Sequence, residues 1–179
     1  MLYPGAVRRP SLSALVLLLA ALQACGYEVV RYSQALGDVR RVAIRAFDND
    51  SFEPAADDWM TEALQREFLR RGAVQLVDDP RSADLVIAGS VRTVDTVSRS
   101  FSSIQFALEY ELRMFLELSV TRIDGSEVLI DPRALAESEL YLASADVEVA
   151  RTNREEALRR LSTALAGRIH DALYERLSP

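Results

Sequence analysis

A run of strictly alternating residues near the middle of the chain most constrains what it can fold into. At positions 104–120 every even-numbered residue is apolar, and the odd-numbered residues between them are mostly polar. A two-residue repeat is typical of a β-strand with one buried face, because successive side chains point to opposite faces of a sheet. At about 3.4 Å per residue the run would reach roughly 55 Å, well beyond the usual strand of about 3–10 residues. The pattern predicts one unusually long strand or two collinear strands.

The residues before this run predict a strand, a helix and two more strands. Residues 40–47 alternate and predict the first strand. Apolar side chains then recur at helical spacing, with Asp57 or Asp58 as the expected cap and Gly72 as the expected stop. Residues 74–77 and 83–97 predict the next two strands.

The residues after the run predict a hairpin and a long closing helix. Asp124-Gly125 is a hairpin-turn signal, leading into a strand at 127–130 that 136–141 would continue. A capping box at 152–155 predicts the start of the last helix. The order β-α-β-β-β-α predicts an α+β fold, a two-layer sandwich with two helices packed on one face of a largely antiparallel, mixed sheet.

The N-terminus has the pattern of a secretory signal. Arg8-Arg9 precede nine consecutive apolar residues, 14–22, too short for the roughly 20 residues of a membrane-spanning helix. The only cysteine follows at once in Leu22-Gln23-Ala24-Cys25, which looks like a bacterial lipobox. That resemblance implies cleavage before Cys25 and a covalent lipid on it. An ordinary signal peptide followed by an unrelated cysteine is the alternative, and export by the general or the twin-arginine route stays open.

These patterns divide the chain into three parts. We expect a lipoprotein signal peptide at 1–24, a lipidated tether at 25–39 and the α+β domain at 40–179. Gly26, rather than an aspartate, follows Cys25, and in bacterial lipoproteins this resemblance implies export to the outer membrane. Loss of Arg8 and Arg9 with the signal would change the net charge from −6 to −8.

The composition excludes most enzyme classes. The chain has one Cys, one His and no Lys, since all 21 basic residues are Arg. It therefore has no internal disulfide, no multi-histidine or cysteine-based metal site and no Schiff-base lysine, and we expect no catalytic residue, metal or cofactor. A sequence pI near 4.9 argues against nucleic-acid binding. His170 is expected on a helix surface, and Glu109 and Glu111 on a solvated strand face.

Several short motifs follow one another along the chain: Cys25-Gly26-Tyr27, the strand at 41–49, the helix end at 69–72, the phrase at 83–91, Glu109-Tyr110-Glu111-Leu112, Asp124-Gly125 and the helix from Asn153. Their order resembles the lipopolysaccharide-assembly lipoprotein family, LptE. The resemblance covers nearly all of residues 25–177 and implies a protein that sits inside the outer-membrane β-barrel LptD. There it would plug the lumen and help lipopolysaccharide reach the cell surface, with its domain on the periplasmic side or in the lumen.

Two arginines are candidate lipopolysaccharide contacts. Arginine binds phosphate with two parallel hydrogen bonds. Arg99 lies in a stretch expected to join two strands, near Phe101 and several hydroxyls. Arg151 precedes the expected last helix, where members of the resembled family often have a basic residue. The alternative for each is a solvated loop arginine.

Other functions stay open at this point. A membrane-anchored periplasmic module that activates peptidoglycan synthesis would share the lipobox and the first strand, but it would need a linker of tens of residues. Only about 14 residues separate Cys25 from the first expected strand. A periplasmic hydrolase is disfavoured because the sequence contains no recognisable nucleophile–base pair.

The lipobox generates the first testable prediction. Replacing Cys25 by Ala removes the expected lipid attachment site, so Cys25→Ala should accumulate as an uncleaved or soluble precursor. Membrane fractionation and intact mass measure this directly. Unchanged membrane association of the variant, with no acyl mass on the wild type, would contradict the lipoprotein assignment.

Overall fold

The computed structural model describes residues 36–101 and 107–178. Cys25, the expected signal peptide and the first residues of the alternating run lie outside the described residues. The strands are β1 (Arg41–Ile44), β2 (Asp48–Asn49), β3 (Gln75–Leu76), β4 (Leu85–Phe101), β5 (Ala107–Arg122) and β6 (Ala136–Leu142). The helices are α2 (Ala56–Arg71) and α3 (Val147–Leu177), with short 3-10 turns η1 (Pro80–Ser82) and η2 (Pro132–Leu135).

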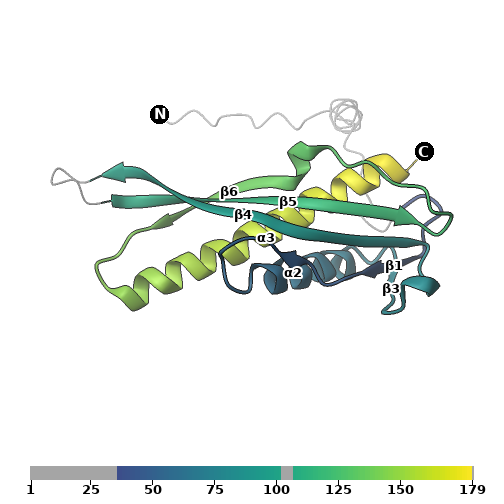
Figure 1. Ribbon diagram of the computed structural model, residues 1–179, viewed down its shortest axis with the longest axis horizontal. Helices are drawn as coiled ribbons and strands as arrows, with labels where there is room; N and C mark the ends of the chain where they lie inside the picture. The colour runs from purple at the N-terminus through teal and green to yellow at the C-terminus, as the bar shows by residue number, and fades with distance from the viewer. Residues whose placement is uncertain (1–35, 102–106, 179) are drawn as a thin grey trace, which may run out of the picture. The chain divides into compact units, whose positions relative to one another are not determined.

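The described strands form one mixed sheet in the order β3-β1-β4-β5-β6, with β2 paired to β4 beyond the end of β1. β1 runs parallel to β3 and β4, whereas β4, β5 and β6 are antiparallel neighbours. Both helices pack against one face of this sheet (Figure 1). The predicted α+β sandwich is confirmed.

The alternating run forms a single long strand as far as it is described. Leu112, Met114 and Leu116 of β5 are buried beneath the helices, whereas Phe115 and Glu117, at alternate positions, are exposed. β4 alternates less clearly because a bulge between Val91 and Thr93 shifts its register against β5. Odd-numbered residues of β4 face the helices before the bulge and even-numbered residues face them after it.

The helix ends differ from the sequence-based expectations. Ala55, in the left-handed region at φ 60°, precedes α2 and makes no side-chain cap, so the expected cap by Asp57 or Asp58 is wrong. Gly72 does end this helix, at φ 64°. α3 begins at Val147, with Asp146 accepting hydrogen bonds from the backbone of Glu148 and Val149.

The first turns of α3 were missed because they carry no buried stripe. Val147 and Val149 are exposed, and the buried positions of this helix begin at Ala157. A pattern of apolar spacing therefore detects the helix only where it meets the core. After the turn at Asp124-Gly125, residues 127–130 also form no strand, and only a bridge between Thr121 and Glu127 is present there.

The packed domain includes residues from the segment expected to be a tether. Leu36 and Val39 are both fully buried in the core. Gly37 lies against the backbone carbonyl of Leu177 at φ 57°, a conformation and a proximity that suit glycine because it has no Cβ. The start of the described chain is therefore fixed to the end of α3.

His170 is buried in the seam between the two helices, so the expected surface position is wrong. Its ring lies edge-on to Phe68, with 5.1 Å between ring centroids. Within the described residues neither ring nitrogen has a hydrogen-bond partner. Burial lowers the pKa of His170, the charge of Arg71 lowers it further, and Asp171 and Glu67 oppose this shift. The imidazole is therefore held neutral.

The buried imidazole predicts acid sensitivity of the fold. Because the pKa of His170 is lower in the folded state, the unfolded chain takes up the proton first as pH falls below about 6.5. Stability should be fully present above that pH and should decrease as the pH falls below it. Thermal melts should show this slope for the wild type and not for His170→Leu, because the chain has only one His.

The two carboxylates with the most strongly lowered pKa values titrate below the pH range in which His170 takes up its proton. The pKa of Glu67 and that of Asp84 are each held at about 2, first by hydrogen bonds from Arg70 and from Arg41 respectively. Their contributions are lost only at more acidic pH, below the ordinary carboxylate pKa. An equal slope in the wild type and in His170→Leu would contradict the assignment.

Candidate functional site

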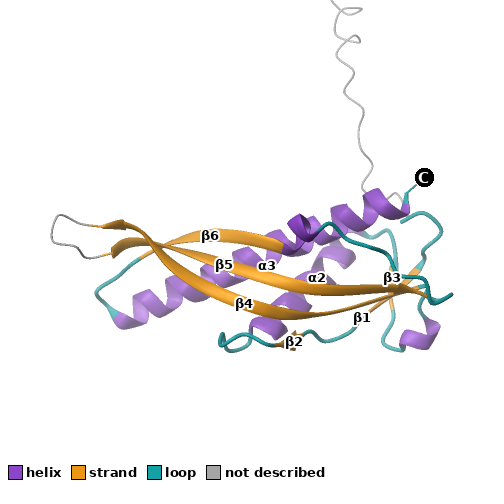
Figure 2. Ribbon diagram, turned by 45° about the horizontal axis from the view of Figure 1, so that its top comes forward, coloured by secondary structure: helices purple, strands orange, loops and turns teal. Residues whose placement is uncertain are grey.

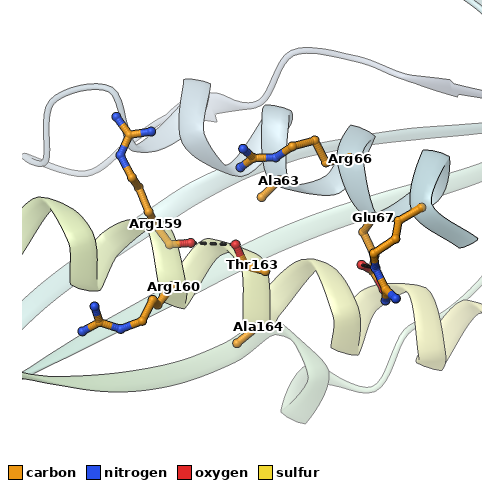
Figure 3. A pocket seen from close by; sticks show the side chains of 8 residues that line it. Ala63, Arg66, Glu67, Arg159, Arg160, Thr163 and Ala164 are labelled. Carbon is orange, nitrogen blue, oxygen red and sulfur yellow. Dashed lines mark hydrogen bonds and ion pairs between the residues drawn. The ribbon is translucent and has the colours of Figure 1, made fainter.

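A groove lined with arginines lies between α2 and α3 and is open to solvent (Figure 3). It has a volume of about 610 Å³. Arg66 and Arg70 stand one turn apart on α2, and Arg159 and Arg160 are adjacent on α3. The remaining lining residues are Ala63, Glu67, Thr163 and Ala164.

One buried carboxylate fixes the inner end of this groove. Glu67 accepts two hydrogen bonds from Arg70, at 2.8 and 2.6 Å, and one from Nε of Arg71 at 2.7 Å. Arg71 also reaches Asp171 on α3 at 2.9 Å, so the network connects the two helices. The low pKa of Glu67 keeps it ionised as an acceptor for these arginines.

The other three arginines of the groove each make an exposed ion pair. Arg66 lies 3.3 Å from Glu62, Arg159 lies 3.0 Å from Glu155, and Arg160 lies 2.6 Å from Glu139. Each of these guanidinium groups is at least half exposed. Exposed pairs contribute about 0–1 kcal/mol, so these ion pairs by themselves hold the guanidinium groups only weakly.

Trp59 supplies an aromatic neighbour to the groove. It packs against the core and is only partly buried. The guanidinium carbon of Arg159 lies 5.5 Å from the centre of its ring, within cation–π range.

The sequence suggested that Arg99 lies in a loop between two strands. The structure places it within β4. It falls in a second irregularity of that strand, between Ser98 and Ser100. Its Nε lies 3.2 Å from a carboxylate oxygen of Glu111, on the sheet face opposite the helices.

Glu111 is buried, so the expected solvated position is wrong. Arg113 donates to it at 2.6 and 3.1 Å, and Arg99 approaches from the neighbouring strand. The hydrogen bond from Arg113 is the main reason that the pKa of Glu111 is lowered. Alternation placed this residue on the correct face, but the two arginines that cover it come from tertiary contacts.

Arg151 lies within α3 rather than before it. Its partners are Glu148 and Glu155 of the same helix. Arg151 lies on α3, whereas Arg99 pairs with Glu111 on the sheet face opposite the helices. The two arginines therefore form no single site in this structure.

The arginine groove was missed by sequence analysis. Arg66 and Arg70 at a spacing of four, together with Arg159-Arg160, were the available signals. They were ambiguous because their convergence depends on how α2 and α3 pack. In the described ranges no group of His, Cys, Asp and Glu side chains is arranged to hold a metal ion. None of the described helices combines the length and apolarity needed to cross a bilayer.

Solved structures of bacterial lipoproteins have a similar fold. Rare lipoprotein B from Shewanella oneidensis matches with a TM-score of 0.54 and 17% identity, covering 76% of this chain and 95% of that one. An uncharacterised lipoprotein B from Nitrosomonas europaea gives a TM-score of 0.52 and 14% identity, over 86% and 91%. A minor lipoprotein from Acinetobacter baumannii gives 0.50 and 18%, over 77% and 93%. No curated protein sequence matches the chain.

The fold is thus that of a bacterial lipoprotein domain with two helices on a mixed sheet. The family model LptE, described as lipopolysaccharide-assembly, matches residues 39–173. The chain therefore belongs to the LptE family, and the resemblance seen in the sequence is confirmed. Membership makes it a non-enzymatic lipoprotein of lipopolysaccharide assembly.

Proposed function

We propose that this protein plugs an LptD-type β-barrel in the outer membrane and assists the passage of lipopolysaccharide through it. The observation that carries the proposal is the family match across residues 39–173. A plug needs an outer surface that suits the polar interior of such a barrel. The sheet face opposite the helices offers Asp95, Arg113 and Ser138 in one cross-strand row, consistent with that requirement.

A lipid on Cys25 would hold the domain close to the membrane. The described core begins at Leu36, so only residues 26–35 separate it from Cys25. Ten residues span at most about 36 Å when fully extended. This reach suits a membrane-bound plug, whereas a module that acts through the peptidoglycan layer needs a longer linker.

Affinity isolation from membrane extracts tests the proposed partner. A C-terminal tag is suitable because the chain ends at the surface beyond α3 (Figure 1). The tagged protein should retain a large β-barrel protein and lipopolysaccharide through detergent washing. Isolation of peptidoglycan synthases without a barrel would contradict the proposal and support the alternative module.

Lipopolysaccharide contacts are proposed at the arginine groove and at the two arginines identified from sequence. Phosphate and apolar groups stand side by side in this lipid, and the groove combines exposed guanidinium groups with Ala63, Ala164 and the nearby Trp59 ring. Arg99 and Arg151 remain candidates, each already paired with glutamates. Compared with the separate positions of Arg99 and Arg151, the groove gathers four arginines in one concave surface.

Variants that remove or reverse arginine charges should distinguish the groove from Arg99 and Arg151 as lipopolysaccharide contacts. Arg66→Gln with Arg159→Gln should weaken lipopolysaccharide binding at least tenfold, since a charge-assisted hydrogen bond is worth about 1.5–3 kcal/mol. Arg99→Glu with Arg151→Glu should have the same effect only if those residues also contact the lipid. Binding of lipopolysaccharide to the purified protein is the measurement.

A matched control removes two charges elsewhere. Arg81→Gln with Arg133→Gln alters two exposed arginines on the short turns η1 and η2. Circular dichroism should show that all three variants keep their fold. Equal weakening by the control pair would show that the groove contributes only general electrostatic attraction. Full binding of lipopolysaccharide by the groove variant would show that the groove is not the binding site.

A further inference from the structure

The outer strands of the sheet are β3 and β6, and β4 presents a further edge beyond β2. β4 pairs with β1 and β2 only as far as Val91, and beyond that point no described strand pairs with it on the side away from β5. Figure 2 shows this part of β4 running free past the end of β2. An unpaired strand edge presents hydrogen-bonding groups to any other extended chain.

The opposite edge, along β6, is covered by side chains of α3. Arg168 donates to the backbone carbonyl of Ala136 at 2.9 Å, and Asn153 donates to that of Leu142 at 3.0 Å. Arg160 reaches the carbonyl of Leu140 at 3.4 Å. These carbonyls point away from β5, so the helix occupies the acceptors that a further strand would use.

The open stretch of β4 is suited to strand pairing. Thr93, Val94, Thr96 and Val97 are β-branched, the residue type that favours strands. The bulges at Val91/Thr93 and Ser98/Ser100 bound one regular stretch. Val97 is 39% exposed, and among the described residues Asp95 has no ion-pair partner.

The pairing of β5 with its two neighbours determines which backbone groups of β4 point toward β5 and which point outward. The carbonyl of Leu108 accepts from Ala143 beyond β6, so even-numbered residues of β5 face β6 and odd-numbered ones face β4. Asp95 and Val97 lie opposite Arg113 and Glu111, and their backbone groups therefore point toward β5. The backbone groups of Val94, Thr96 and Ser98 consequently point outward.

We propose that this edge pairs with the same edge of a second copy of the chain, antiparallel about a two-fold axis at Val97. Thr96 of each copy then exchanges backbone hydrogen bonds with Ser98 of the other, because the backbone groups of both residues point outward. Val97 meets Val97, which covers its exposed side chain. Asp95 comes opposite Arg99 in both directions, an attractive cross-strand charge pair.

The geometry also limits the assembly to two copies. A two-fold interface uses the same patch on both partners and closes on itself. Side chains of α3 already bind three carbonyls along β6, which disfavours further strand pairing at that edge. The proposal rests on the strand edges alone and is independent of the barrel-plug function.

Disulfide trapping tests the pairing on the full chain. In the proposed register the two Val97 residues form a non-hydrogen-bonded pair, whose Cα separation of about 4.5 Å suits a disulfide. Val97→Cys should give a covalent dimer on non-reducing gels after mild treatment with oxidised glutathione. Thr93→Cys is the matched control, because its two copies would stand roughly 27 Å apart at eight residues of about 3.4 Å. The unmodified chain, which carries only Cys25, sets the background.

A backbone variant tests whether the pairing uses the outward groups. In the Val97→Cys chain, Thr96→Pro removes an outward donor, which an edge strand tolerates, and should reduce the dimer at least tenfold. Thr96→Val keeps the donor and should leave the dimer unchanged. If Thr96→Pro fails to fold in a thermal melt, the comparison of positions 97 and 93 still decides. Equal trapping at both positions, a monomer at both, or trapping of Val97→Cys to a different protein would overturn the proposal.

Discussion

The rest of the structure depends on the antiparallel pairing of β4 with β5, which runs from Leu85 opposite Arg122 to Phe101 opposite Ala107. Two such long strands expose a wide apolar surface on one face, and this surface must be covered. α2 and α3 supply the cover through stripes that meet Leu112, Met114 and Leu116. The short strands β1 and β3 extend the same face by parallel pairing and bring Val42 into the core. The hairpin therefore determines where the helices lie and which face remains open.

Sequence patterns predicted the parts of this arrangement in which burial is periodic. Alternation identified β5 because its buried face is uninterrupted, and helical spacing identified α3 from Leu158 onward because each of its turns there meets the core. The same reasoning failed where structure forms without burial. The first turns of α3 after Asp146 contain no buried residue, and Ala55 precedes α2 without making a side-chain cap. The register shift at Val91 also exchanges the two faces of β4, which weakens the pattern that reveals a strand.

The candidate site was less predictable than the fold because its geometry comes from tertiary contacts. Arg99 and Arg151 were identifiable as arginines, but their partners Glu111 and Glu148 depend on strand register and helix start. His170 was misplaced for a related reason. It lies beside the main apolar stripe of α3, and only the packing of Phe68 from α2 encloses it. A single helix considered alone cannot show which of its flanks a second helix will cover.

The charge pattern is compatible with the proposed site for an anionic lipid on an acidic chain. At physiological salt, fields between exposed charges decay over about 8–10 Å, so the overall negative charge matters less than the nearest side chains. Between α2 and α3 the acidic partners of Arg66 and Arg159 lie along their own helices and outside the groove lining. Glu67 is the acidic residue of that lining, and Arg70 and Arg71 already saturate it. The guanidinium groups therefore dominate the potential within the groove. The open edge of β4 lies on the sheet and away from this groove, so an anion and a second protein strand would occupy separate surfaces of the same domain.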